Sequence, residues 1–320
     1  MTDNFFLASI IIPNYNGLRF LTPCLNALRA QSYPREHTEI ILVDDASTDN
    51  SVAFVTEQYP EVKVVQLARN SGLAVGCNAG ARAALGELLV MLNNDTEVEP
   101  CWLAALVETA TANPQAGAIA SKMLLFDRRD TLHNAGDLMG ADGIPRNRGV
   151  WQVDRGQFDD QPQIFGGCGG GVMYRRAAWE QTGGFDERLF MYLEDVDLAW
   201  RLQLLGWGAV FAPAARLYHH LSATGGGTLA SFYVGRNTIW VIAKDMPGPL
   251  IRRHFGPIVR AQWHITRDAL RAWRGESARA RLRGQLAGVI GLPKVLGWRR
   301  AMQKTQPALI ERLSELLVTE

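Results

Sequence analysis

ASIIIPNYNG (Ala8–Gly17) and EIILVDDASTDN (Glu39–Asn50) each join a short apolar run to a cluster of Asn, Asp or Ser. Apolar runs bounded by such clusters predict buried strands. Strand and helix patterns then alternate: helices at 18–31, 51–59, 73–85 and 100–112, strands at 8–13, 39–44, 62–67 and 88–92. Four such β-α units predict an α/β fold, a mainly parallel, Rossmann-like doubly wound sheet with helices on both faces.

The remainder of the chain divides by composition. Residues 127–171 are irregular and rich in glycine, 172–218 return to regular patterns, and the chain from about 246 is helical and basic. We expect a catalytic domain at 1–246, with a nucleotide-binding half at 1–99 and an acceptor-binding half at 100–246. A C-terminal helical, basic amphipathic segment follows at 247–320.

Composition fits a folded protein, with 47% hydrophobic and 20% charged residues. The net charge of +1 hides an asymmetry, because 251–304 carries 13 Lys or Arg against two acidic residues, which leaves the rest of the chain acidic. Such a basic segment predicts an anionic partner. No basic region precedes an apolar stretch at the N-terminus, and the four cysteines lack metal-type spacing, so we expect a reduced, cytoplasmic setting.

Polar side chains follow each predicted strand of the first half. They are Asn14–Gly17, Asp44–Asp49, Arg69–Gly72 and Asn93–Asp95. In parallel sheets, ligands bind beyond the carboxyl ends of the strands. Turn and helix-cap chemistry explains any one of these clusters alone. Four clusters on one rim favour a nucleotide site, and the carboxylate of Asp95 suits a divalent ion that also holds a diphosphate.

Two further groups carry chemistry. Glu194 and Asp195 open a predicted helix, where carboxylates stabilise the helix dipole but can also accept a proton from a bound hydroxyl. His219 and His220 follow a strand-like stretch; a neutral imidazole there is a candidate metal ligand, although such pairs are more often structural.

Six blocks of the chain, in order, resemble the family 2 glycosyltransferases, the GT-A fold enzymes. The blocks are SIIIPNYNG (Ser9–Gly17), VDDASTDN (Val43–Asn50), NSGLAVGCNAG (Asn70–Gly80), LNNDTEV (Leu92–Val98), GGFDERLF (Gly183–Phe190) and YLEDVDLAWR (Tyr192–Arg201). The resemblance covers about three-quarters of the chain and implies an inverting, metal-dependent hexosyltransferase that uses a nucleotide-sugar donor.

The resemblance also implies roles for individual residues. The nucleotide would be bound by Pro13, Asn14, Tyr15, Asn16, Asp45, Asn70, Gly72, Asn93 and Asn94. The family's Asp-X-Asp motif falls on Asn93–Asp95, so Asp95 would hold Mg²⁺ or Mn²⁺, with His219 preferred over His220 as the additional ligand. Asp195 would be the general base, with Glu194 or Asp197 as lesser choices. Gly169, Gly170, Asp186 and Trp179 would shape the acceptor side.

The choice of donor sugar and acceptor rests on similarity alone. The Asn93–Val98 block and GRNTIWVIAKDMP (Gly235–Pro247) look most like bacterial rhamnosyltransferases that use dTDP-rhamnose, which implies a dTDP- or UDP-sugar donor and cell-wall or surface polysaccharide synthesis. The acceptor would be a glycan or a polyprenyl-linked glycan. The linkage and the oligomeric state, including a homo-oligomer, are not set by the sequence. A sugar nucleotidyltransferase and a degenerate sugar-nucleotide-binding module remain alternatives.

The basic tail predicts peripheral attachment at the inner face of the cell membrane. Val259, Trp263, Thr266, Leu270 and Trp273 share one helical face, beside a row of arginines at Arg260, Arg267, Arg271 and Arg274. This pattern is typical of a helix that lies in a membrane interface. A helix packed on the catalytic domain is the alternative. Nucleic acid is not expected as a partner, because the tail has few aromatic residues.

Overall fold

The computed structural model describes residues 5–220, 226–302 and 307–319. The first half holds β1 (Ala8–Asn14), α1 (Leu18–Arg29), η1 (Arg35–His37), β2 (Thr38–Asp44), α2 (Ser51–Gln58), β3 (Lys63–Gln66), α3 (Leu73–Ala83), β4 (Leu88–Leu92), β5 (Thr96–Val98) and α4 (Trp102–Ala112). The four predicted β-α units are therefore present, with ends that differ from the expected ones by a few residues at most.

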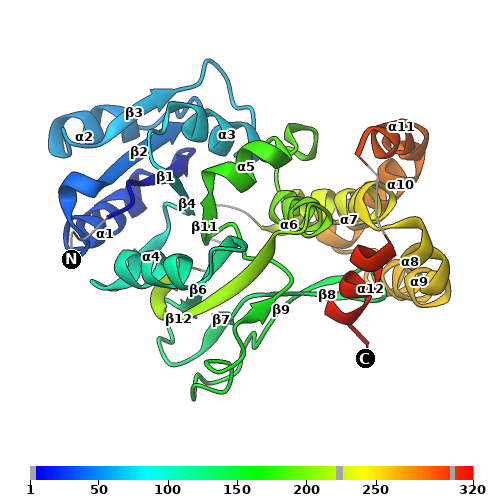
Figure 1. Cartoon of the computed structure of the whole chain (residues 1–320). Coiled ribbons are helices and arrows are strands. Elements are labelled where there is room, and N and C mark those ends of the chain that lie inside the picture. Colours follow the sequence, from blue (N-terminus) through cyan, green and yellow to red (C-terminus); the bar gives the residue numbers. More distant parts are fainter. Residues whose placement is uncertain (1–4, 221–225, 303–306, 320) are drawn as a thin grey trace.

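One sheet is built from strands between residues 8 and 219, in the order β10-β12-β6-β11-β4-β1-β2-β3, where β10 is Gln163–Ile164 (Figure 1). Its middle strands come from the second half: β6 (Ala116–Leu125), β11 (Gly171–Arg175) and β12 (Gly208–His219). β1 pairs in parallel with β2 and β4, whereas β11 lies antiparallel to both β4 and β6. The predicted α/β class with a mainly parallel sheet is confirmed, with β11 as the antiparallel strand at its centre.

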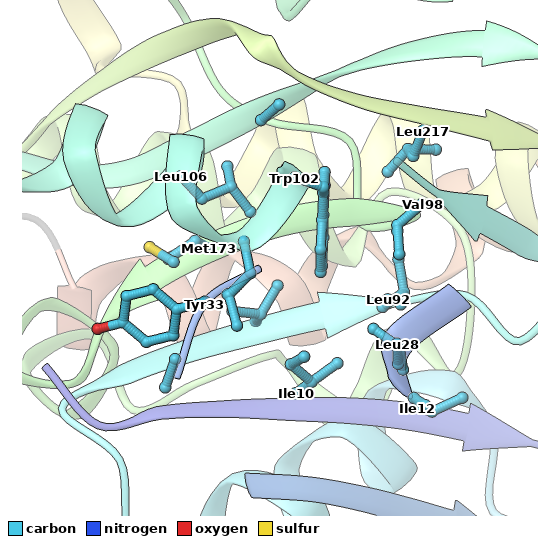
Figure 2. Close-up of a cluster of buried hydrophobic side chains, with 14 of the residues drawn as sticks. Ile10, Ile12, Leu28, Tyr33, Leu92, Val98, Trp102, Leu106, Met173 and Leu217 are labelled. Atoms are coloured by element: carbon cyan, nitrogen blue, oxygen red, sulfur yellow. The ribbon is translucent and has the colours of Figure 1, made fainter. Parts of the chain in front are cut away.

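Both faces of the sheet are covered because β1 is apolar on both sides. Successive side chains of a strand point to opposite faces. Ile10 and Ile12 pack with α1 and α4 in one buried cluster, where Trp102 is fully buried (Figure 2). Ile11 points to the other face and joins a second cluster with residues of α3 and of α6 (Glu194–Leu204).

Close approach of α3 to the sheet depends on one glycine. A Cβ atom at Gly80 would lie 2.3 Å from Cγ2 of Ile11 and 2.9 Å from Cγ2 of Val43. The helix axis therefore sits nearer the strands than an alanine would permit. This seats the N-terminal end of α3 beside the carboxyl ends of β1 and β2, where the candidate site lies.

The region 127–171, expected to be irregular, holds four short strands: β7 (Leu132–Asn134), β8 (Asp137–Gly140), β9 (Pro145–Asn147) and β10 (Gln163–Ile164). β8 pairs with β9 and with β13 (Leu317–Val318) from the end of the chain. α5 (Arg176–Thr182) and η2 (Glu187–Leu189) complete the second half. The end of the chain therefore packs back onto the part that carries the site.

The C-terminal part is helical, as expected. It comprises α7 (Gly227–Asp245), α8 (Gly248–Arg253), α9 (Phe255–Arg271), α10 (Glu276–Ile290), α11 (Leu292–Met302) and α12 (Pro307–Leu316). Figure 1 shows these helices together on the side of α6 that faces away from β1–β3. Within the described ranges, no helix is both long and apolar enough to cross a bilayer.

Candidate active site

The carboxyl ends of β1, β2 and β4 are tied together by buried amides. Asn14 donates a hydrogen bond from Nδ2 to Oδ1 of Asp44 at 3.1 Å. Asn94 in turn donates from Nδ2 to Oδ1 of Asn14 at 2.7 Å. Both asparagine side chains are almost fully buried. They hold three strand ends in register and thereby shape the rim on which the other site residues stand.

Two loops of this rim are fixed by side-chain acceptors. The carboxylate of Asp45 accepts hydrogen bonds from the backbone N–H groups of Ser71 and Gly72, at 2.7 and 2.8 Å. The side-chain oxygen of Asn16 accepts one from the backbone N–H of Thr48 at 2.8 Å. Asp45 and Asn16 therefore organise the loops in addition to any contact with a ligand. Tyr15 and Asn70 keep exposed side chains beside them, and Pro13 is half-buried.

Gly72 joins this rim to the loop that precedes α6. Its φ of +91° lies in the region that favours glycine, and a Cβ atom there would lie 2.5 Å from the ring of Phe190. The structure thus gives each predicted nucleotide residue a place at or below one rim. Their contacts with a nucleotide stay predictions.

Asp95 and His219 meet at the end of β4, although 124 residues separate them. Nε2 of His219 lies 3.3 Å from Oδ1 of Asp95 and 3.2 Å from Nδ2 of Asn93. β12 brings the histidine there, because its last residues pair with β5, directly after the Asn-Asn-Asp turn. His220 instead stacks on the ring of Phe126 at 3.6 Å. The geometry therefore favours His219 over His220 as the partner of Asp95.

A third histidine, His133, lies beside this pair. Its ring is nearly parallel to that of His219, with centroids 4.9 Å apart. Burial, followed by the neighbouring imidazole of His219, lowers the pKa of His133 to about 4, so this ring is neutral at pH 7. The Nδ1 atoms of both rings are buried and have no hydrogen-bond partner in the described part of the chain.

The donor set at Asp95 fits a divalent cation that shares its ligands with a substrate. Two adjacent octahedral ligands at about 2.1 Å from Mg²⁺ lie about 3 Å apart, close to the separation of the Asp95 and His219 atoms. The described residues include no group of three or more His, Cys, Asp or Glu side chains able to hold a metal ion. Asp95 and His219 would be the protein's ligands at this position, with phosphate oxygens and water as further ligands.

Asp195 is held at the start of α6 by two backbone donors. Its Oδ2 accepts a hydrogen bond from the N–H of Gly169, and its Oδ1 accepts one from the N–H of Val196, both at 2.8 Å. The chain enters the helix through residues with positive φ, including Tyr192 at 65° and Leu193 at 66°. Such backbone is strained in non-glycine residues and persists only where surrounding contacts impose it.

The surroundings of Asp195 differ from those of the neighbouring carboxyl groups, Glu194 and Asp137. Burial, and then the charge of Asp195, raises the pKa of Glu194 well above its usual range and that of Asp137 to about 8. Burial also raises the pKa of Asp195, but hydrogen bonds from three backbone N–H groups oppose this shift. Of the three carboxyl groups, Asp195 is the one whose charged form is favoured by several backbone donors, which suits it to accept a proton.

The catalytic and metal candidates line one cavity of about 490 Å³. Asp95, His219, Asp195 and Glu194 all border it, together with Gly169, Gly170 and Asn93. The same cavity is bordered by Asp137 and His133, which the sequence did not single out. Residues that suit metal binding and proton transfer are thus within reach of one bound molecule.

Asn237 of α7 is a further residue that sequence reasoning missed. It is fully buried, and its Nδ2 donates hydrogen bonds to the carbonyl oxygens of Leu189, Met191 and Tyr192, at 3.2, 3.0 and 2.7 Å. Asn237 thereby holds the strained loop that positions Asp195. Its signal was the polar pair Arg236–Asn237 inside an otherwise apolar helix.

Three of the expected side chains do not border the cavity that holds Asp195. Trp179, expected on the acceptor side, is 6% exposed and packs in the core against Tyr174 and Phe185. Asp186, also expected there, is paired with Lys244 at 2.5 Å and with Arg188 at 2.6 Å.

Asp197, a lesser choice for the base, is fully buried against Lys244 and Arg201. None of these three residues borders the cavity described above. Core packing holds Trp179 away from the cavity. The carboxylates of Asp186 and Asp197 are held away from it by ion pairs, in both cases with the buried Lys244.

The family model described as "Glycosyl transferase family 2" matches residues 9–183. Among curated proteins, the O-antigen biosynthesis protein RfbC of Myxococcus xanthus is 33% identical over 230 residues, which is 68% of this chain and 17% of that protein. The N-acetylglucosaminyl-diphospho-decaprenol L-rhamnosyltransferase of Mycobacterium tuberculosis is 30% identical over 60% of this chain and 69% of its own length. The chain thus spans a small part of the first relative and about two-thirds of the second.

Solved structures show the same fold at lower identity. The mannosyltransferase PcManGT from Pyrobaculum calidifontis, in complex with GDP-Man and Mn²⁺, has a TM-score of 0.55 at 18% identity and covers 98% of this chain and 80% of its own. GalNAc-T7 with UDP, GalNAc and Mn²⁺ has a TM-score of 0.63 at 20% identity, over 76% of this chain and 48% of its own.

Proposed function

The chain belongs to glycosyl transferase family 2, and from this premise we propose that it is an inverting glycosyltransferase acting on a nucleotide-diphosphate sugar. The observation that carries the proposal is the cavity in which Asp195, Asp95 and His219 lie together. A base for the acceptor hydroxyl and a metal site for the diphosphate are the two groups that such a transfer needs. The rim formed by Asn14, Asp45 and their neighbours is the proposed nucleotide site.

In the proposed reaction, Asp195 accepts the proton of the acceptor hydroxyl as its oxygen attacks the anomeric carbon. The C–O bond to the diphosphate breaks in the same displacement, which inverts the anomeric configuration. Gly169 and Val196 orient the carboxylate of Asp195 through their backbone N–H groups, which favour its charged form. Asp95 and His219 would hold Mg²⁺ or Mn²⁺, which neutralises diphosphate charge when bound.

We propose dTDP-rhamnose as the donor and a lipid-linked glycan as the acceptor, in cell-wall or surface polysaccharide synthesis. Support comes from the 30% identity to the mycobacterial enzyme, whose name states rhamnosyl transfer to a decaprenol-linked sugar. The division into a catalytic part at 1–246 and a C-terminal segment belongs to the same proposal.

The test is a panel of dTDP-, UDP- and GDP-sugars with Mn²⁺, Mg²⁺ or EDTA, in which release of nucleoside diphosphate is measured. We expect slow, metal-dependent hydrolysis of one donor, faster when an acceptor is supplied. Asp195→Asn should bind that donor normally and lose transfer at least about 1,000-fold, in line with the loss of a general base. Asp160→Asn is the matched control, because Asp160 is an exposed aspartate outside the cavity.

The alternatives give different products. A sugar nucleotidyltransferase would release pyrophosphate from a nucleoside triphosphate and a sugar phosphate. A degenerate module would bind one donor and turn over none. Either result with folded protein would overturn the proposed activity.

A further inference from the structure

Helix α9 presents an apolar strip to solvent. The strip consists of Phe255, Val259, Trp263, Leu270 and Trp273, whose exposed fractions are 63%, 49%, 59%, 51% and 59%. Phe255, Val259, Trp263 and Leu270 follow each other at four- and seven-residue steps, so they share one face of α9. Trp273 continues the strip in the turn just after the helix. Two tryptophans and three large aliphatic or aromatic side chains in one row form an apolar patch, not scattered surface residues.

The side of α9 that borders the strip, away from the arginines, packs on the protein. Ile258 and Ala269 are buried there, and Thr266 donates a hydrogen bond to Oε1 of Gln285 on α10 at 3.2 Å. These contacts fix the rotation of the helix, so the apolar strip is held outward rather than left over from loose packing. The helix therefore packs on the rest of the protein with its arginines in solvent, as the sequence alternative expected, and still leaves the strip uncovered.

A row of arginines lies directly beside the strip. Arg260, Arg267 and Arg271 lie on α9 itself, and Arg274 follows its last turn. The one acidic residue of α9, Asp268, pairs with Arg267 at 3.3 Å and with Arg271 at 3.7 Å, but it is 62% exposed. Ion pairs between exposed side chains contribute little free energy and are screened by salt. The row therefore keeps a strong net positive charge toward solvent.

We propose that this surface of α9 docks on an anionic lipid bilayer. An outward apolar strip flanked along its length by arginines matches a helix that inserts its apolar side below the headgroups and keeps its cations among them. A nucleic acid would satisfy the arginines and leave the tryptophans in water. A second copy of the chain would cover the strip but bring two arginine rows together, which like charges oppose.

The docked helix also borders a cavity that lies next to the one holding Asp195. A second cavity, of about 510 Å³, is lined by Ile265 and Ala269 on the inner side of α9 and by residues of α7 and α10. It shares Pro145 and Val234 with the cavity that holds Asp195. Docking of α9 on the membrane would bring an acceptor carried by a membrane lipid close to the reacting groups. This consequence rests on the proposed function.

Binding to vesicles tests the docking without any substrate. The full chain is mixed with sucrose-loaded vesicles made of phosphatidylcholine alone, or of phosphatidylcholine with about one-third phosphatidylglycerol. The fraction of protein bound to the vesicles is measured after sedimentation. We expect binding to the anionic vesicles that falls steeply with salt. Trp263→Ala should weaken binding about ten-fold, and Arg260→Gln combined with Arg274→Gln about 30-fold.

The matched control is Trp151→Ala, because Trp151 is 57% exposed but lies outside α9. It should bind like the wild type. Equal binding of both vesicle types, or equal effects of Trp263→Ala and Trp151→Ala, would overturn the proposal. So would a dimer in sedimentation velocity that Trp263→Ala dissociates, because a second copy would then cover the strip. Donor hydrolysis is measured separately, so failure of docking and failure of the proposed activity are distinguishable.

Discussion

Replacing Asn237 by leucine should damage both stability and catalysis. The change keeps side-chain size but removes the two N–H donors that hold the carbonyl oxygens of Leu189, Met191 and Tyr192. A net hydrogen bond is worth about 1 kcal/mol, and a buried carbonyl left without a partner costs about 1–3 kcal/mol. With two donors removed, we expect the free energy of unfolding to fall by about 2–4 kcal/mol.

Catalysis should suffer because the released loop leads into Asp195. Three of its residues, Phe190, Tyr192 and Leu193, have φ near +65° and relax once nothing holds them. A shift of about 1 Å in a reacting group costs about 100-fold in rate. We therefore expect kcat to fall about 10- to 100-fold and the donor KM to change less, since this loop meets the nucleotide rim at the contact of Phe190 with Gly72 while it leads directly into Asp195.

Urea unfolding followed by circular dichroism, and initial rates with the donor found in the panel, measure the two effects. Thr238→Val is the matched control, because Thr238 is also buried but its hydroxyl bonds only to Val234 within α7. It should lose less than about 1 kcal/mol and keep its kcat. If Asn237→Leu stays within about 0.5 kcal/mol of the wild type with unchanged kcat, the loop is not held as argued.

Three further changes test other parts of the site. Because the pKa of Asp137 is raised to about 8, the native state keeps a proton that the unfolded chain releases above about pH 4. This group therefore lowers stability by up to about 1.4 kcal/mol per pH unit between pH 4 and 8, and Asp137→Asn should remove that slope in urea titrations. Lys244→Met removes the buried ammonium from Asp197 and should cost about 3–5 kcal/mol in urea unfolding. His219→Ala should raise the Mn²⁺ concentration for half-maximal turnover at least about ten-fold, with donor binding in EDTA unchanged.

For each of these three predictions, one result would contradict the reasoning. An unchanged pH slope in Asp137→Asn would mean that the carboxyl is ionised when native. Wild-type stability of Lys244→Met would mean that Arg201 alone neutralises Asp197. Unchanged Mn²⁺ dependence in His219→Ala would leave Asp95 as the sole protein ligand, and Asp95→Asn would then be the variant to measure.

The sequence by itself determined the fold of the first half of this protein and the edge of the sheet on which its polar residues meet. In a strand such as Ile10–Ile12, successive apolar side chains point to opposite faces of the sheet. Both faces are therefore buried, as in a parallel sheet covered by helices on each side. The carboxyl ends of parallel strands meet at one edge, so Asn14, Asp45 and Asp95 were expected together before any contact was known. Local pattern and chain direction suffice for this level of structure.

Tertiary structure alone decided which side chains reach the cavity. Asp186, Asp195 and Asp197 are alike in the sequence, but buried cations from α6 and α7 neutralise the first and the last, and only Asp195 borders the cavity. His133 and Asn237 are separated from the residues they serve by long stretches of chain. Contacts of this kind depend on how helices and strands pack, and short-range patterns carry no information about which distant group a side chain will face.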